Sequence, residues 1–204
     1  MNTHLRALLL IAALACLAVG IAVGWAQLNA PRIREAEQQL QARTLLAVLP
    51  RDRYDNQPLQ QPLTLPLPTL AHSTLLGGYR ATLHGQPSAV VLHSRVQGYA
   101  GPLHLLIAID RNGRLMATHV LQHQETPGLG GKITEPGNAW LRGFEGHTLR
   151  GTPDSAWALK RDAGQFDQLA GASVTSRAVI QAVHEALRYF DEHAPALLGA
   201  GAHE

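Results

Sequence analysis

A helix with one apolar face near the end of the chain is the feature that most constrains the fold. Apolar residues recur there at intervals of three and four, which is the spacing of one buried helical face. These residues are Val179, Ala182, Val183, Ala186, Leu187 and Phe190. Because Ser and Thr favour helix starts, we expect the helix to begin between Ser173 and Ser176. Such a face has to be buried against another layer of structure.

The start of this helix is a candidate anion site. The first turn of a helix carries unpaired backbone N–H groups and a partial positive charge, and both attract phosphate. Small residues stand just before it at Gly171 and Ala172, and hydroxyls follow at Ser173 and Thr175. Two interpretations fit this pattern. The hydroxyls either belong to a phosphate site or simply cap the helix.

Four segments before the helix have strand-like sequences, and they predict an antiparallel sheet. They cover residues 79–84, 89–96, 103–109 and 115–122. Asn112 and Gly113 separate the last two and predict a type I′ hairpin turn. We also expect a short helix over 138–144, with Trp140 and Phe144 facing inward, and a strand over 157–160. The predicted fold class is α+β, with the long helix packed on the sheet.

The first part of the chain predicts a single membrane-spanning helix. Residues 7–26 are 20 residues without a charge, and a helix needs ~20 apolar residues to cross a bilayer. A cleaved signal peptide and a lipoprotein signal at Cys16 are the competing interpretations. We expect an anchor over 1–30, a stalk helix from Pro31 to about Leu46 and a Pro-rich connector up to residue 76, and a folded domain over 77–204.

A second motif occupies residues 123–132. Thr126, Pro127 and Gly128 have the composition of a tight turn, and Gly130 and Gly131 let the backbone approach a flat ligand closely. Such a loop is typical of one wall of a cofactor site.

These motifs resemble a known family. Residues 167–173 resemble the flavinylation motif of periplasmic FMN-binding subunits, in which the last hydroxyl residue carries FMN through a phosphoester bond. Residues 123–132, 157–160 and 167–169 resemble segments of the G subunit of the Rnf (Rsx) electron transport complex, RnfG. The C subunit of the sodium-pumping NADH:quinone reductase, NqrC, is similar in the same region but is normally longer.

The resemblance implies a covalent FMN on Ser173, where the family usually has Thr. Ala170 is a second departure, because that position is often Ser or Thr in the family. Thr175 is a rival acceptor. Gly171, Ala172 and Val174 complete the phosphate end of the expected site.

By the same analogy, the loop at 123–132 lines the flavin through Glu125, Thr126, Gly128, Leu129 and Lys132. Leu129 is expected to pack on the ring. Lys132 is expected near the N1 side, where a cation would raise the flavin potential. The alternative for Lys132 is a solvated side chain.

The implied function is that of a covalently flavinylated subunit of a membrane-bound, ion-translocating complex linked to ferredoxin and NAD. It would pass electrons through FMN and would not catalyse the overall reaction alone. Its implied partners are the other Rnf-type subunits and a flavin transferase, and its implied location is the bacterial inner membrane with residues 31–204 in the periplasm. A free-standing anchored FMN carrier, an NqrC-like protein and a non-redox binding protein are the alternatives.

Other functions are not favoured by the sequence. The formal net charge of +2, without a basic stripe, does not favour nucleic acid binding. His119 and His123 have no nearby Cys or acidic cluster that would complete a metal site. Ser173 lacks the Gly-x-Ser-x-Gly turn of a hydrolase nucleophile.

Overall fold

The computed structural model describes Gly20, Trp25 and residues 48–199. The chain separates into two units, residues 1–43 and 44–204. The predicted anchor, apart from Gly20 and Trp25, and the predicted stalk helix therefore lie outside the described residues. Within the described part, no helix is both long enough and apolar enough to span a bilayer.

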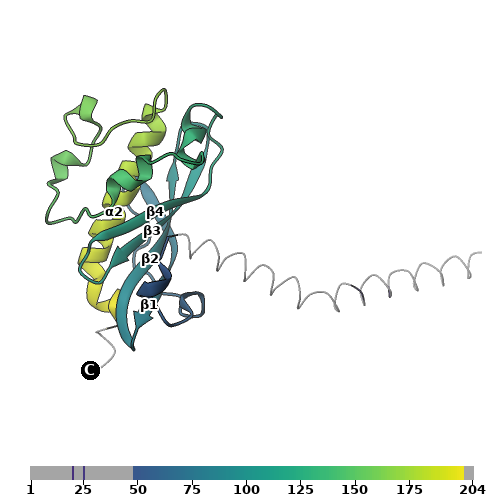
Figure 1. Cartoon of the computed structure of the whole chain (residues 1–204), viewed down its shortest axis with the longest axis vertical. Helices are drawn as coiled ribbons and strands as arrows, with labels where there is room; N and C mark the ends of the chain where they lie inside the picture. The colour runs from purple at the N-terminus through teal and green to yellow at the C-terminus, as the bar shows by residue number, and fades with distance from the viewer. Residues whose placement is uncertain (1–19, 21–24, 26–47, 200–204) are drawn as a thin grey trace, which may run out of the picture. The chain divides into compact units, whose positions relative to one another are not determined.

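The second unit is built on a four-stranded antiparallel sheet, as the sequence predicts. Its strands lie in chain order: β1 (Ser73–Leu83), β2 (Gln86–Gln97), β3 (Pro102–Asp110) and β4 (Leu115–Gln122). The sheet is a meander in which each strand pairs with the next (Figure 1). Strand β1 begins at Ser73, before the expected start of the core near Gly77.

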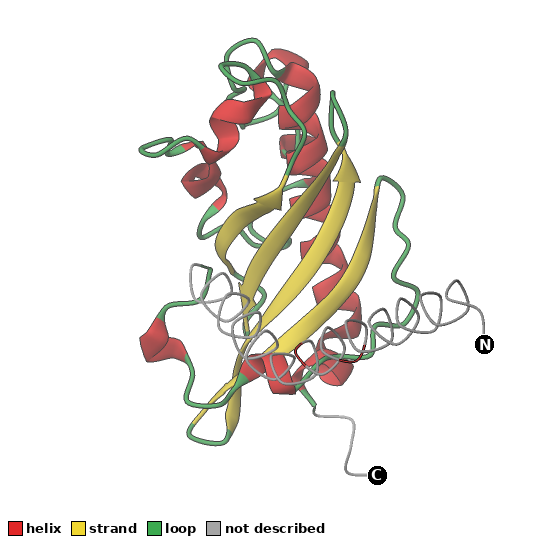
Figure 2. Ribbon diagram, turned by 90° about the vertical axis from the view of Figure 1, so that its right-hand side faces the viewer, coloured by secondary structure: helices red, strands yellow, loops and turns green. Residues whose placement is uncertain are grey.

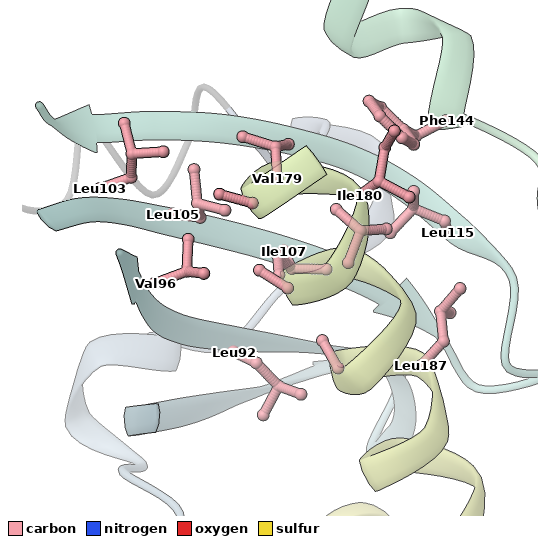
Figure 3. Packing of buried hydrophobic residues seen from close by; sticks show 14 of the residues in the cluster. Leu92, Val96, Leu103, Leu105, Ile107, Leu115, Phe144, Val179, Ile180 and Leu187 are labelled. Carbon is pink, nitrogen blue, oxygen red and sulfur yellow. The ribbon is translucent and has the colours of Figure 1, made fainter. Parts of the chain in front are cut away.

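One long helix, α2 (Ser173–Leu198), packs along one face of this sheet (Figure 2). It begins at the first residue of the predicted interval. Leu105 and Ile107 on β3 face Val179 and Ile180 on α2 across the core (Figure 3). Each of these four side chains is at most 1% exposed, so their burial stabilises the pairing of helix and sheet by about 1.5–3 kcal/mol per side chain.

The other face of the sheet carries a second, smaller core. Val48 and Leu49 pack there with Val91 and Ala108. The Pro-rich segment also belongs to the folded unit, because its residues Leu63, Leu65 and Leu70 pack against the main core. Prolines disfavour a regular helix along this segment. A single 3-10 turn, Pro58–Gln60, begins with Pro58, where proline's missing N–H is not needed.

The turn between β3 and β4 is not of the predicted type I′. That turn requires a positive φ at both central residues, whereas Gly113 (φ 79°) is the one residue of the turn in that region. Gly113 N donates to Asp110 O at 3.0 Å, and Asp110 Oδ1 accepts from the N–H groups of Asn112 (2.8 Å) and Arg114 (3.0 Å). The Asp110 carboxylate thus favours a type I turn followed by a left-handed glycine.

The segment between β4 and α2 is a succession of short 3-10 turns that gather around the first turns of α2 (Figure 1). The predicted short helix is present as Trp140–Phe144, with Phe144 1% exposed and Trp140 half-buried. The predicted strand at 157–160 is wrong. Leu159 makes a single parallel bridge with Phe166, because the chain folds back on itself within the loop before a ladder forms.

Candidate functional site

Ser173 is the first residue of α2, and its hydroxyl faces out of the helix start. Its Oγ donates a hydrogen bond to Gln168 Oε1 at 3.0 Å and accepts one from Arg161 Nη1 at 3.3 Å. The side chain does not cap the helix, and Ala172 at the cap position has no hydroxyl to do so. The first N–H groups of α2 therefore remain available to a ligand.

Thr175, the rival acceptor, has its hydroxyl turned into the protein. The residue is 0% exposed, and its Oγ1 donates to Glu125 Oε2 at 2.6 Å. The hydroxyl is therefore already used in a buried hydrogen bond. The capping interpretation fails here as well, because this bond goes to a side chain fifty residues away.

Glu125 is a buried carboxylate that joins three segments. It is 5% exposed and accepts hydrogen bonds from Thr175 Oγ1 and from Ala100 N at 3.2 Å. Gly130 lies against the same pair: a Cβ added there would be 2.8 Å from Thr175 Oγ1 and would also clash with the carboxylate. Glu125 thus fastens the 125–131 loop to the first turn of α2 through its carboxylate. The expected contact of Glu125 with the flavin stays a prediction.

Ser176 is a third hydroxyl, and it closes the motif turn. It is 0% exposed, its Oγ donates to Ala172 O at 2.8 Å, and it accepts from Leu169 N at 3.0 Å. It therefore holds residues 169–172 against the helix and sets the position of Ser173. Sequence reasoning missed this role, since the residue type alone does not separate an inward from an outward hydroxyl.

The loop at 126–131 reaches the motif through Leu129. Pro127 and Gly128 are the central residues of a type II turn, with Leu129 N donating to Thr126 O at 3.1 Å and a φ of 74° at Gly128. A Cβ added at Gly171 would be 2.8 Å from Leu129 Cδ2, so Gly171 allows the two motifs to touch.

Two large apolar side chains are exposed near Ser173. Leu129 is 45% exposed, and Val174, the next residue of the helix, is 48% exposed. Both belong to segments that meet at Gly171 and Ser173. Such an apolar surface beside an anion site is what a ligand with a flat ring and a phosphate needs.

Lys132 lies in the 3-10 turn Gly130–Thr134 and is half-buried. Its carbonyl accepts a hydrogen bond from Asn138 Nδ2, and its N–H donates to Leu129 O at 3.2 Å. No hydrogen bond or ion pair of its ammonium group occurs within residues 48–199. Its expected place beside the flavin stays a prediction.

Two ion pairs lie in the segment that contains Ser173, residues 160–177. Lys160 Nζ lies 2.7 Å from Asp167 Oδ2, and Arg177 binds Asp162 through two bonds of 2.7 and 3.1 Å. The bond from Arg177 lowers the pKa of Asp162 and the same bond raises the pKa of Arg177, so both remain charged at neutral pH. Trp140 Nε1 donates to Asp167 O at 2.7 Å and fixes this end of the loop.

Metal ligation is not suggested by the geometry. Across the described part of the chain, no group of three or more His, Cys, Asp or Glu side chains is placed to hold a metal ion. His123 is used locally, since its Nδ1 accepts from Glu125 N at 3.2 Å and its Nε2 lies 3.0 Å from Thr134 Oγ1. His119 is partly buried, and burial lowers its pKa.

A family model for an FMN-binding domain matches residues 98–188, a range that contains every candidate site residue. The matched range includes both the 125–131 loop and the start of α2.

Full-length relatives define the family more narrowly. The G subunit of the ion-translocating oxidoreductase complex of Pseudomonas aeruginosa is 44% identical over 213 residues, covering 100% of this chain and 97% of that protein. The protein of the same name from Vibrio cholerae is 36% identical over 91% of this chain and 89% of that protein. The chain belongs to the family of G subunits of ion-translocating oxidoreductase complexes, which confirms the resemblance found in the sequence.

A solved structure of a more distantly related protein is also similar to this chain. The crystal structure of the C subunit of the Na(+)-translocating NADH-quinone reductase from Parabacteroides distasonis is 25% identical, with a TM-score of 0.47. The match covers 58% of this chain and 62% of that chain.

Proposed function

We propose that this chain is an electron-transfer subunit of a membrane-associated, ion-translocating oxidoreductase complex, and that it carries FMN at the start of α2. Similarity to the G subunits over the whole chain supports this role. The FMN-binding domain match over 98–188 supports the cofactor. When bound, FMN accepts electrons in pairs and releases them one at a time.

The FMN is attached covalently to Ser173. The observation that carries this proposal is the contrast among the three hydroxyls of the first turn of α2. Ser173 is half-buried with an outward hydroxyl, whereas Thr175 and Ser176 are 0% exposed and hydrogen-bonded inside the protein. Ser173 is therefore the hydroxyl that a flavin transferase could reach.

The attachment forms one bond and breaks one. The oxygen of Ser173 bonds to the phosphorus of the flavin phosphate, and its proton passes to the phosphate of the leaving mononucleotide. A phosphoanhydride bond in a flavin dinucleotide donor breaks, and the mononucleotide of the other half leaves. No atom changes oxidation state. The unpaired N–H groups at the start of α2 stabilise the phosphate charge.

The remaining candidate site residues bind the flavin non-covalently. Leu129 and Val174 offer exposed apolar surface to the ring, and Thr126 and Gly128 shape the loop that presents Leu129. Lys132 supplies a cation on the same loop. Residues 1–30 anchor the protein, the connector leads to the FMN-binding domain, and that domain lies on the periplasmic side of the bacterial inner membrane.

The test is flavin attachment in cells that contain the transferase. Wild type, Ser173→Ala, Ser173→Thr and Thr175→Ser are compared by intact mass and by in-gel flavin fluorescence after denaturation. We expect attachment in all except Ser173→Ala, with circular dichroism showing that this variant is folded. A folded Ser173→Ala variant that still carries covalent flavin would move the site elsewhere.

Membership of a complex has its own test. Native membranes are solubilised in mild detergent and the tagged chain is purified. Co-purification with integral membrane proteins of the complex supports the proposed role. Recovery of a flavinylated monomer alone would favour the alternative of a free-standing carrier.

A further inference from the structure

The charges of residues 160–177, the segment that contains Ser173, do not cancel. Three cations and two carboxylates lie in this segment. Lys160 is paired with Asp167, and Arg177 is paired with Asp162 through two bonds. Arg161 is left with a longer contact to Asp162, at 4.0 Å, whose oxygens Arg177 already occupies.

The uncompensated positive charge is that of Arg161, which contacts the Ser173 hydroxyl. Its guanidinium donates a hydrogen bond from Nη1 to Ser173 Oγ at 3.3 Å. The Arg161 side chain is 59% exposed, and apart from this bond no hydrogen bond of its guanidinium occurs within residues 48–199. An arginine has five donors in a planar fork that matches two phosphate oxygens, so the group has unused capacity for an anion at this oxygen.

We propose that Arg161 is the phosphate-binding side chain of the flavin site, positioning the phosphorus of the donor at Ser173 Oγ and then neutralising the attached phosphodiester. This inference rests on the proposed function. A phosphodiester carries one negative charge, and the ion pairs above leave one positive charge beside Ser173. The start of α2 adds its partial positive charge on the same side.

The geometry of the hydroxyl agrees with this role. The Ser173 proton points to Gln168 Oε1, and Arg161 occupies one lone pair of the oxygen. The second lone pair is left for the phosphorus. As the oxygen–phosphorus bond forms and the anhydride bond of the dinucleotide breaks, Arg161 moves its donor from the hydroxyl to the phosphate oxygens.

The first experiment measures the initial rate of flavin attachment with purified transferase and a flavin dinucleotide donor. Arg161→Ala is expected to slow attachment by about tenfold, the loss typical of one charge-assisted hydrogen bond. Arg161→Lys should recover part of the rate, because it keeps the charge but not the fork. The matched control is Lys160→Ala, an adjacent cation of equal exposure (60%) that is committed to Asp167 and should change the rate by less than about twofold.

The second experiment examines the attached phosphate directly. Holo-protein of each variant, prepared by long incubation, is compared by phosphorus NMR. The phosphodiester signal should shift in Arg161→Ala and stay in place in Lys160→Ala. A merely structural role for Arg161 would not move this signal.

The outcomes separate the two proposals. Suppose that the wild type takes up flavin and that Arg161→Ala has the same attachment rate and the same phosphorus signal as the wild type. This result would overturn the role of Arg161 and leave the proposed function intact. Equal slowing by Lys160→Ala would also overturn it, because the effect would then be general surface charge. Wild type that takes up no flavin with an active transferase would remove the proposed function and this inference together.

Discussion

The two ends of α2 satisfy their backbone groups in opposite ways. At the C-terminal end, Gly199 adopts a left-handed conformation (φ 81°) and donates to Ala196 O. Arg80 on β1 adds two bonds, from Nε to Leu197 O at 2.6 Å and from Nη2 to Ala196 O at 3.0 Å. At the N-terminal end no side chain caps the helix, although three of its first four residues carry hydroxyls.

In the proposed function, the N-terminal end is the one that binds the ligand. An unfilled helix end costs stability unless water or a ligand binds its N–H groups. Thr175 and Ser176 use their hydroxyls to fasten loops to the helix, and Ser173 presents its hydroxyl outward. At the C-terminal end, Gly199 and Arg80 bond to the last carbonyl groups of the helix.

The largest expected effect tests the fastening of the N-terminal end. Thr175→Val keeps the shape of the side chain but removes the donor to Glu125, leaving a buried carboxylate with one bond fewer. We expect the free energy of unfolding in urea to fall by about 3 kcal/mol. Thr175→Ser, the matched control, keeps the hydroxyl and should cost about 1 kcal/mol or less. Equal losses of unfolding free energy in Thr175→Val and Thr175→Ser would show that the hydrogen bond to Glu125 does not stabilise this end of the helix.

Ser176→Ala is expected to have the next largest effect. It removes the partner of Leu169 N, a buried donor, and should lower the free energy of unfolding by about 2 kcal/mol. Because Ser176 sets the turn before Ser173, flavin attachment should slow as well. Unchanged stability and unchanged attachment would show that the turn forms without this bridge.

A smaller effect is expected at the C-terminal end. Arg80→Ala removes two bonds to the last carbonyls of α2 and should cost about 1 kcal/mol of unfolding free energy. Flavin attachment should remain at the wild-type rate, measured by fluorescence. Arg95→Ala on β2, an exposed arginine, is the control for loss of a positive charge. A loss of flavin attachment in Arg80→Ala would show that the two ends of α2 do not act independently.

The smallest expected effect is the pH dependence of stability, which does not depend on the two ends of the helix. Burial is the main cause that lowers the pKa of His93, His119 and His184 below the ordinary value of 6.5. The unfolded chain therefore binds more protons than the folded one as pH falls through that value, so stability decreases. The urea midpoint should be lower at about pH 5.5 than at about pH 7.5. His184→Gln should flatten this dependence, and a midpoint that rises on acidification would contradict it.

Local patterns in the sequence predict the elements of the fold well. The apolar spacing from Val179 to Phe190 places the helix, and alternating residues place the sheet, because both patterns follow from burial of one face. The Asn112–Gly113 dipeptide predicts the wrong turn, since the turn type depends on hydrogen bonds that the Asp110 carboxylate accepts from the backbone. The 157–160 segment has a strand-like sequence, yet it has no long partner with which to form a ladder.

The roles of the site residues depend on contacts between distant segments. Glu125 and Thr175 are fifty residues apart, and their bond decides which hydroxyl faces inward. Arg161 comes near Ser173 because the loop between them folds back, and no spacing rule places it there. From the sequence, residue type favours Thr175 as the acceptor and register with the family favours Ser173. The inward turn of the Thr175 hydroxyl depends on the contact with Glu125.

The most direct measurement is fragment-ion mapping of the flavin-bearing peptide from the wild-type protein. The chain is expressed with the transferase, digested, and the fluorescent peptide is sequenced by mass spectrometry. We expect the mass of the flavin phosphate to stay on Ser173, with Thr175 and Ser176 unmodified. A modification on Thr175 would contradict this expectation, because that hydroxyl would have to leave Glu125 to react.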